Sequence, residues 1–135
     1  MEVKIDTKEK FHVITLMEPI LSDKIAADLA ITTTQYLETP TKNIILKLPN
    51  TTAIDASAAE ALSITQQKFY ENNASFFICE VQKDVEDKLD ELELLEVLNI
   101  TPTESEAWDI VQMEEIEREL LDNEEDVEFN SHGEK

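Results

Sequence analysis

The residues of this chain whose types and spacing could do chemistry lie in the segment 51–57. This segment, Thr-Thr-Ala-Ile-Asp-Ala-Ser, follows an apolar run at residues 44–48 and precedes an alanine-rich stretch with helical spacing. A serine hydroxyl at a helix start can accept a phosphate, because free backbone amides and the helix dipole stabilise negative charge there. Asp55 is favoured at such a place for the same reason. The residue directly after Asp55 is Ala56, which has no hydroxyl to carry a phosphate.

Structural roles compete with functional ones in this segment. Asp55 is suited to cap the following helix, and capping is compatible with a place on a partner surface. Ser57, with Glu60 three residues later, matches a capping box in which the serine hydroxyl binds the Glu60 amide. We therefore expect Ser57 to be a cap. Its phosphorylation is the weaker alternative, and phosphorylation of Thr51 or Thr52 is weaker still.

Composition excludes several other kinds of site. The net charge of −20 argues against nucleic acid and against anionic membrane surfaces, and it suits a basic protein partner. Cys79 is the single cysteine, so no intrachain disulfide can form, and its apolar neighbours predict burial. His12 and His132 lack nearby ligands, and the single glycine, Gly133, excludes glycine-rich phosphate loops. We expect no metal and no cofactor.

Charge and hydropathy also predict the domain organisation. Residues 1–120 are expected to form one domain, followed by an acidic, disordered tail at 121–135 in which acidic residues far outnumber basic ones. Such a tail would solvate the domain, or it could recruit a basic surface. The first residues lack a signal-peptide core, and no run reaches the ~18 apolar residues of a membrane span. The chain is therefore predicted to be cytoplasmic.

Hydrophobic patterning predicts strands and helices that alternate along the chain. The expected strands are residues 3–5, 11–16, 43–48, 75–81 and 97–100, with 75–81 central and 97–100 at an edge. The expected helices run from Ser22 or Asp23 to before Pro40, over about 57–72, over 84–91, and onward from a Thr103 cap. Trp108 is expected to anchor the last helix in the core, and the alternative is an exposed aromatic contact for a partner. The order predicts a single α/β domain with a mixed, mostly parallel sheet and about four helices.

The order and spacing of these segments resemble the STAS domain, a family named for sulphate transporters and anti-sigma factor antagonists. The resemblance covers about residues 2–118. It is carried by the strand at 44–48, the loop ending Ile54-Asp55-Ala56-Ser57, the helix from Ala58, the strand at 76–81, and Glu104-Ser105-Glu106-Ala107-Trp108. In bacterial members this loop reads Asp-Ser-Ser/Thr-Gly. The serine after the aspartate is phosphorylated by a kinase that is also an anti-sigma factor, and the phosphoserine repels that partner.

Carried over by position, the resemblance implies a switch without its phosphoacceptor. Asp55 matches the family aspartate, Ala56 the phosphoacceptor, Ser57 the second hydroxyl residue and Ala58 the glycine. Phosphorylation at position 56 is impossible, and without glycine at 58 the loop path is expected to differ. The resemblance thus implies a non-catalytic regulatory module that binds its partner constitutively. Its implied partner surface comprises Thr51, Thr52, Asp55, Ala56 and Ser57, flanked by Ser22 and Asp23.

A different role remains open beside this one. STAS domains also serve as structural subunits of ABC-type lipid transporters and of stress complexes, and those roles need no phosphoserine. The resemblance therefore implies either an anti-sigma factor with serine-kinase character or a transporter subunit as the partner. A homodimer formed through the edge strand is a further option. An enzyme is the least supported reading, because the sequence offers no nucleophile–base pair, metal cluster or phosphate loop.

Overall fold

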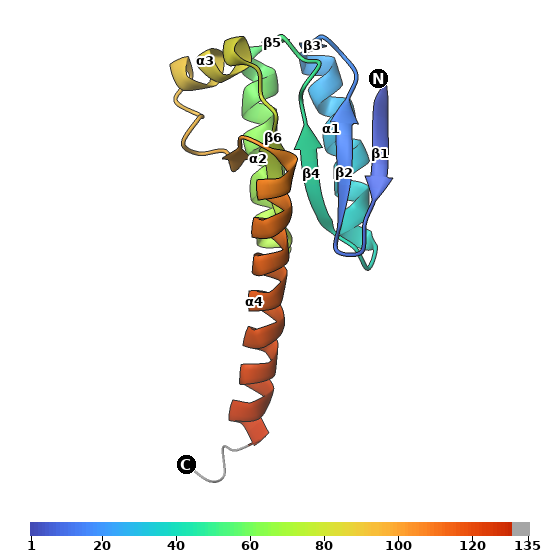
Figure 1. Ribbon diagram of the computed structural model, residues 1–135, viewed down its shortest axis with the longest axis vertical. Helices are drawn as coiled ribbons and strands as arrows, with labels where there is room; N and C mark the ends of the chain where they lie inside the picture. Colours follow the sequence, from blue (N-terminus) through green and yellow to red (C-terminus); the bar gives the residue numbers. More distant parts are fainter. Residues whose placement is uncertain (131–135) are drawn as a thin grey trace.

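A five-stranded sheet with helices on both faces forms the body of the protein (Figure 1). The computed structural model describes residues 1–130, with side chains described through Leu121. The strands are β1 (Val3–Thr7), β2 (Phe11–Leu16), β4 (Asn43–Lys47), β6 (Phe76–Cys79) and β7 (Ile100–Thr101). Their order is β1-β2-β4-β6-β7; β1 and β2 are antiparallel and the other pairs are parallel. The predicted mixed, mostly parallel sheet is confirmed.

The middle of the sheet belongs to β4, and not to the strand near 75–81 that we expected to be central. Apolar content alone could not indicate which of β4 and β6 is central. Both strands are covered on both faces, so both are continuous apolar runs in the sequence. An edge strand follows β6 in the sheet as predicted, but it lies at Ile100–Thr101 and overlaps the expected 97–100 only at Ile100. Only Ile100–Thr101 pairs with β6, and Val97 lies in the turn before it.

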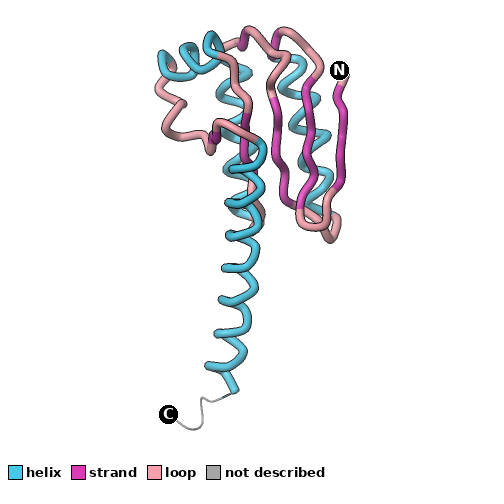
Figure 2. Tube along the Cα trace, in the orientation of Figure 1, coloured by secondary structure: helices cyan, strands magenta, loops and turns pink. Residues whose placement is uncertain are grey.

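The described residues form four α-helices. Figure 2 draws the helices in cyan. They are α1 (Asp23–Thr34, continued by the 3-10 turn η1, Gln35–Glu38), α2 (Ala56–Glu71), α3 (Lys83–Glu91) and α4 (Glu104–Asn130). Successive residues of β4 point to opposite faces. Ile44 and Leu46 join the core beneath α1 and α2, whereas Ile45 packs with Ala107 and Val111 of α4. Among residues 1–130, no helix combines the length and the apolar character that a bilayer span requires.

Two of the predicted helix caps are confirmed, and a third is wrong. The Ser22 hydroxyl accepts from the Ile25 amide at 3.4 Å, and the Thr103 hydroxyl accepts from the Glu106 amide at 3.2 Å. The capping box at Ser57 does not form, because α2 starts at Ala56 and Ser57 is already its second residue.

The early start of α2 follows from a two-stranded sheet that the sequence analysis missed. β3 (Ile20–Leu21) pairs in parallel with β5 (Ala53–Ile54), and the Asp55 amide then donates to the Leu21 carbonyl at 3.1 Å. This bond places Asp55 at the N-cap. Ala58 lies inside α2 and is not among the residues with positive φ, so no glycine is needed there.

The last helix is longer than we expected. α4 continues to Asn130, although we placed the start of a disordered tail at residue 121. No glycine or proline interrupts residues 104–130, and glutamate is a good helix former, so nothing local ends the helix. The final residues of the predicted tail, 131–135, lie outside the described part of the chain.

Candidate protein-binding surface

Two loops are tied together at one end of the molecule by the β3–β5 pairing. The Pro19 carbonyl accepts from the amides of Thr52 at 2.8 Å and Ala53 at 3.3 Å. The Thr51 hydroxyl donates to the Glu18 carbonyl at 2.8 Å. The loop before α1 and the loop before α2 are therefore hydrogen-bonded into one edge, near the labels β3 and β5 in Figure 1.

This edge brings together most of the residues that the sequence indicated. Because Leu21 and Asp55 are hydrogen-bonded, Ser22 and Asp23 at the start of α1 lie beside the start of α2. We call the surface formed by Ser22, Asp23, Thr52, Asp55, Ala56 and Ser57 the N-terminal edge. All of these residues are exposed except Ser22, which is half-buried and occupied as a cap.

Thr51 is the predicted surface residue that the structure does not place at the surface. It is fully buried, so it positions the loop and offers no contact area. Asp55 shows the opposite behaviour. It occupies the N-cap position, yet its side chain makes no capping hydrogen bond and projects from the exposed edge. Its carboxylate is available to a partner.

Sequence reasoning missed the apolar part of the edge. Ile20 is 51% exposed and Met17 is 37% exposed, and Ile20 is paired with Ala53 beside the N-terminal edge. An exposed apolar side chain among polar neighbours suits a protein contact. A two-residue strand has no periodicity to detect, so the spacing of these residues gave no signal.

The charge of the edge is predominantly acidic. Asp23, Asp55 and Glu60 are exposed around the two helix starts, and Lys24 is the neighbouring basic residue. Carboxylates near helix N-termini are stabilised by the dipole, so they are tolerated here at low cost. Such an edge has complementary charge to a partner that presents Lys or Arg.

Trp108 is a core anchor, as the sequence predicted. It packs edge-to-face on Phe11, with ring centroids 5.2 Å apart, and it is half-buried. Its indole Nε1 donates to Glu104 at 2.8 Å. The ring is thereby fixed at the start of α4 and helps to hold that helix on the sheet.

Cys79 and His12 are structural residues. Cys79 is fully buried, as expected, and burial together with the nearby carboxylates of Glu80 and Glu104 raises the pKa of its thiol to about 12. The buried His12 ring contacts the Thr7 hydroxyl and the Thr41 carbonyl, each at 3.0 Å. Within the described residues, no group of three or more His, Cys, Asp or Glu side chains could hold a metal ion.

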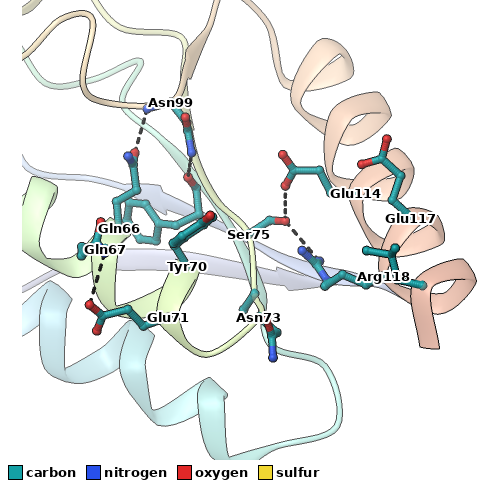
Figure 3. Close-up of a pocket in the computed structure, with 13 residues that line it drawn as sticks. Gln66, Gln67, Tyr70, Glu71, Asn73, Ser75, Asn99, Glu114, Glu117 and Arg118 are labelled. Atoms are coloured by element: carbon teal, nitrogen blue, oxygen red, sulfur yellow. Dashed lines mark hydrogen bonds between the residues drawn. The ribbon is translucent and has the colours of Figure 1, made fainter. Parts of the chain in front are cut away.

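A wide groove of about 880 Å³ lies between the C-terminal half of α2 and α4 (Figure 3). Several of the polar groups that line it are paired with one another. The Ser75 hydroxyl contacts Glu114 and accepts from Arg118, and Gln66 bridges to the amide of Asn99 at 2.7 Å. These contacts hold α4 beside α2 and β6.

The sequence model of the STAS domain matches residues 2–107. The chain belongs to the STAS domain family. No curated protein matches it at a significant level. The resemblance inferred from the loop and its flanking segments is thus confirmed, and the fold matches solved STAS structures.

Three solved structures illustrate the similarity of this STAS domain to its relatives. A proposed anti-sigma factor antagonist from Thermotoga maritima has a TM-score of 0.69 at 20% identity, with 82% of this chain and 94% of that chain covered. The unphosphorylated anti-sigma factor antagonist SpoIIAA has a TM-score of 0.66 at 15% identity, with 82% and 96% covered. The murine anion transporter Slc26a9 has a TM-score of 0.66 at 13% identity. The match covers 80% of this chain, which spans only 18% of the transporter.

Proposed function

We propose that this STAS domain is a non-catalytic module that binds a protein partner without a phosphorylation switch. One observation carries the proposal: Ala56 is exposed as the first residue of α2, directly after Asp55, where the family pattern has its phosphoacceptor serine. The similar anti-sigma factor antagonist SpoIIAA has a structure in its unphosphorylated form. In this chain, position 56 has no hydroxyl to modify.

The mechanism follows from the charge and geometry of the N-terminal edge. A partner of the anti-sigma factor or serine kinase type would contact Ile20 through apolar groups and Asp23 and Asp55 through basic groups. A phosphate at position 56 would add about two negative charges to this contact and disturb it. Because alanine cannot carry phosphate, the affinity for the partner stays constant.

The first experiment identifies the partner and then tests the edge. The tagged protein is captured from its own host lysate, and co-purifying proteins are identified by mass spectrometry. Recovery of a kinase-like ATPase or a sigma regulator is expected. We then expect Ala56→Asp to weaken binding at least tenfold, because it places a charge in the contact. Ala56→Ser should bind normally until the kinase and ATP are added.

A matched control separates the edge from general charge effects. Ser105 is exposed in the first turn of α4, so Ser105→Asp adds the same charge at a comparable helix position. It should leave affinity unchanged. If Ala56→Asp and Ala56→Ser both bind the captured partner like the original chain, the N-terminal edge is not the surface used.

A structural subunit is the second candidate function. The same missing hydroxyl favours it, because a scaffold role needs the fold and no phosphoserine. The murine anion transporter Slc26a9 contains a region with the same fold as this chain. Capture of transporter subunits in a membrane fraction, with affinity insensitive to Ala56→Asp, would support this role over the regulatory one.

A further inference from the structure

The outward face of α4 carries an apolar stripe formed by Met113, Ile116 and Leu120. These side chains are 58%, 56% and 55% exposed. Their spacing of three and four residues places them on one face of the helix. Three large apolar side chains in a row on a surface helix indicate a contact that is not made within the described part of this chain.

The stripe points away from the sheet. Val111 is fully buried against the sheet, and Arg118 is hydrogen-bonded to Asn43 of β4. Met113 lies two residues after Val111, and Ile116 and Leu120 lie two residues before and after Arg118. Two residues correspond to a rotation of about 200° around a helix with 3.6 residues per turn. The stripe is therefore opposite the buried face of α4.

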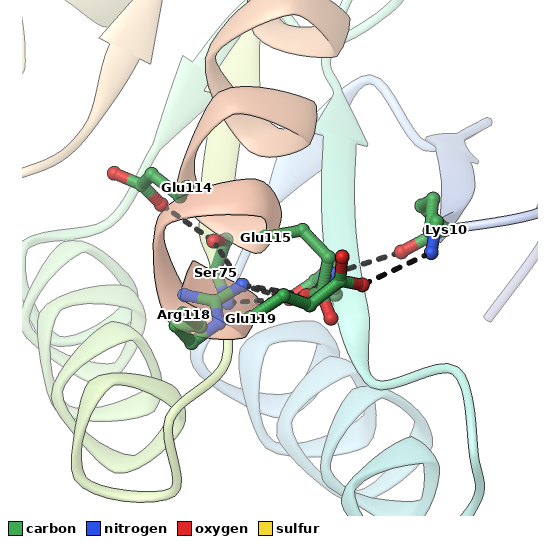
Figure 4. A network of polar contacts seen from close by, with 7 residues as sticks. Lys10, Ser75, Glu114, Glu115, Arg118 and Glu119 are labelled. Atoms are coloured by element: carbon green, nitrogen blue, oxygen red, sulfur yellow. Dashed lines mark hydrogen bonds and ion pairs between the residues drawn. The ribbon is translucent and has the colours of Figure 1, made fainter. Parts of the chain in front are cut away.

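A set of polar contacts, which we call the polar clasp, fixes the rotation of α4 about its axis. It is formed by Arg118, Glu115, Asn43 and Ser75, together with the pair Lys10–Glu119. Arg118 donates to Asn43 at 3.1 Å, to Ser75 at 3.2 Å and to Glu115 at 2.9 Å, and Asn43 also donates to Glu115 at 3.0 Å (Figure 4). Lys10 pairs with Glu119 at 3.3 Å. Rotating the helix would break all of these contacts, so the stripe remains exposed.

The charges beside the stripe indicate what covers it. Asp109 and Glu117 are exposed next to it, and Glu119 is exposed nearby but paired with Lys10. Arg118, the one basic residue between 104 and 121, is engaged toward the sheet. A second copy of α4 would bring carboxylates against carboxylates in either orientation, which is destabilising. A helix with apolar residues on one face and Lys or Arg at the flanks matches both the stripe and its charge.

We propose that the Met113–Ile116–Leu120 stripe docks a basic amphipathic helix of a partner protein. This surface is separate from the N-terminal edge. Figure 1 places β3 and β5 at one end of the molecule, whereas α4 runs toward the other end and past the strands. The two surfaces can be occupied at the same time, so the protein can bridge two partners.

The test uses the full chain and a defined probe. The probe is a fluorescein-labelled 21-residue peptide with leucine and isoleucine at heptad core positions and lysine at the flanking positions. Fluorescence anisotropy is measured at physiological salt. We expect the original chain to bind this peptide at least tenfold more tightly than a scrambled peptide of the same composition, and also than a glutamate-flanked analogue.

Paired variants separate the stripe from general surface effects. Ile116→Ser with Leu120→Ser should lower affinity at least tenfold. Ile31→Ser with Ile64→Ser, which alters side chains 61% and 70% exposed on α1 and α2, should leave it unchanged. Circular dichroism checks that both pairs of variants fold.

Equal binding of the scrambled peptide, or equal affinity of both variant pairs, would overturn the proposal. So would sedimentation showing a dimer of the original chain that Ile116→Ser dissolves, because the occupant would then be a second copy.

Discussion

The backbone amide of Asp55 donates a hydrogen bond to the carbonyl oxygen of Leu21 at 3.1 Å, and this bond joins the starts of α1 and α2. The N-terminal edge is therefore built by main-chain pairing and buried hydroxyl contacts. Its exposed side chains, including those of Asp23, Asp55 and Ala56, contribute little to that framework. Substitutions at these exposed positions should change binding while the fold remains intact.

The buried hydroxyl of Thr51 gives a stability prediction for this framework. Thr51→Val removes the donor to the Glu18 carbonyl in a fully buried site. We expect the free energy of unfolding to fall by about 1–2 kcal/mol, because a buried polar group loses its partner. Urea unfolding followed by circular dichroism measures the change.

Thr52→Val is the matched control. The Thr52 hydroxyl is exposed and donates to the Pro19 carbonyl at 3.2 Å, so water can replace it. Its loss should cost less than about 0.5 kcal/mol. Equal effects of the two substitutions would show that burial of Thr51 does not govern the loop.

Replacing Glu93, in the turn after α3, by glycine should stabilise the fold. Glu93 follows the helix with φ of 61°, a left-handed conformation that costs a non-glycine residue roughly 1 kcal/mol. Its negative charge also lies at a helix C-terminus, where the dipole disfavours it. We expect Glu93→Gly to raise the free energy of unfolding by about 0.5–1 kcal/mol, in thermal and urea unfolding.

Asn73 provides the comparison for that prediction. It has φ of 57° at the equivalent position after α2, but asparagine adopts this conformation readily. Asn73→Gly should therefore produce a smaller change than Glu93→Gly. If both variants gain stability equally, the left-handed backbone at Glu93 is not the source of the effect.

Long periodic segments made the fold predictable, and short pairings made part of the site unpredictable. The strands near 11–16 and 43–48 and the helix near 57–72 have enough residues to show their period. β3 and β5 have two residues each, yet they fix where α2 starts and place the exposed Ile20 opposite Ala53. The Ser57 capping box failed for this reason, since a tertiary hydrogen bond overrode a local pattern. The acidic character of residues 121–130 favoured a tail, whereas α4 runs to Asn130 because no residue in this stretch breaks a helix.

Cys79 should be inert to thiol reagents in the folded protein. Burial raises the pKa of its thiol to about 12, and Glu80 and Glu104 add to the shift. The thiolate is the reactive form, so labelling with Ellman's reagent at pH 8 should be slow and should become rapid in urea. Rapid labelling of the native chain would contradict this.

The raised pKa of Cys79 also predicts how the free energy of unfolding changes at high pH. The folded pKa lies above the ordinary value of 9.0, so the unfolded chain ionises first. The stabilising contribution is complete below about pH 9 and is lost as the pH rises toward 12. Cys79→Ala should lose less stability over that interval than the original chain, as measured by urea unfolding at each pH.

Glu115 belongs to the polar clasp on α4, and its contribution to stability should depend on pH. Burial alone would raise the pKa of this carboxyl, but hydrogen bonds from Asn43 and Arg118 and the charge of Arg118 outweigh it, and the pKa is lowered. A lowered folded pKa means that the carboxylate stabilises the fold above its ordinary pKa of 4.5 and ceases to do so as the pH falls through the folded value. Glu115→Gln should therefore cost about 1.5 kcal/mol at pH 7, the lower end of the range for a hydrogen bond to a charged group because Glu115 is half-buried, and much less at pH 3. Glu119→Gln is the control: it removes only an exposed ion pair with Lys10, so the free energy of unfolding should change little at either pH. If Glu115→Gln lowers the free energy of unfolding equally at pH 7 and pH 3, the charge of Glu115 does not hold α4 on the sheet.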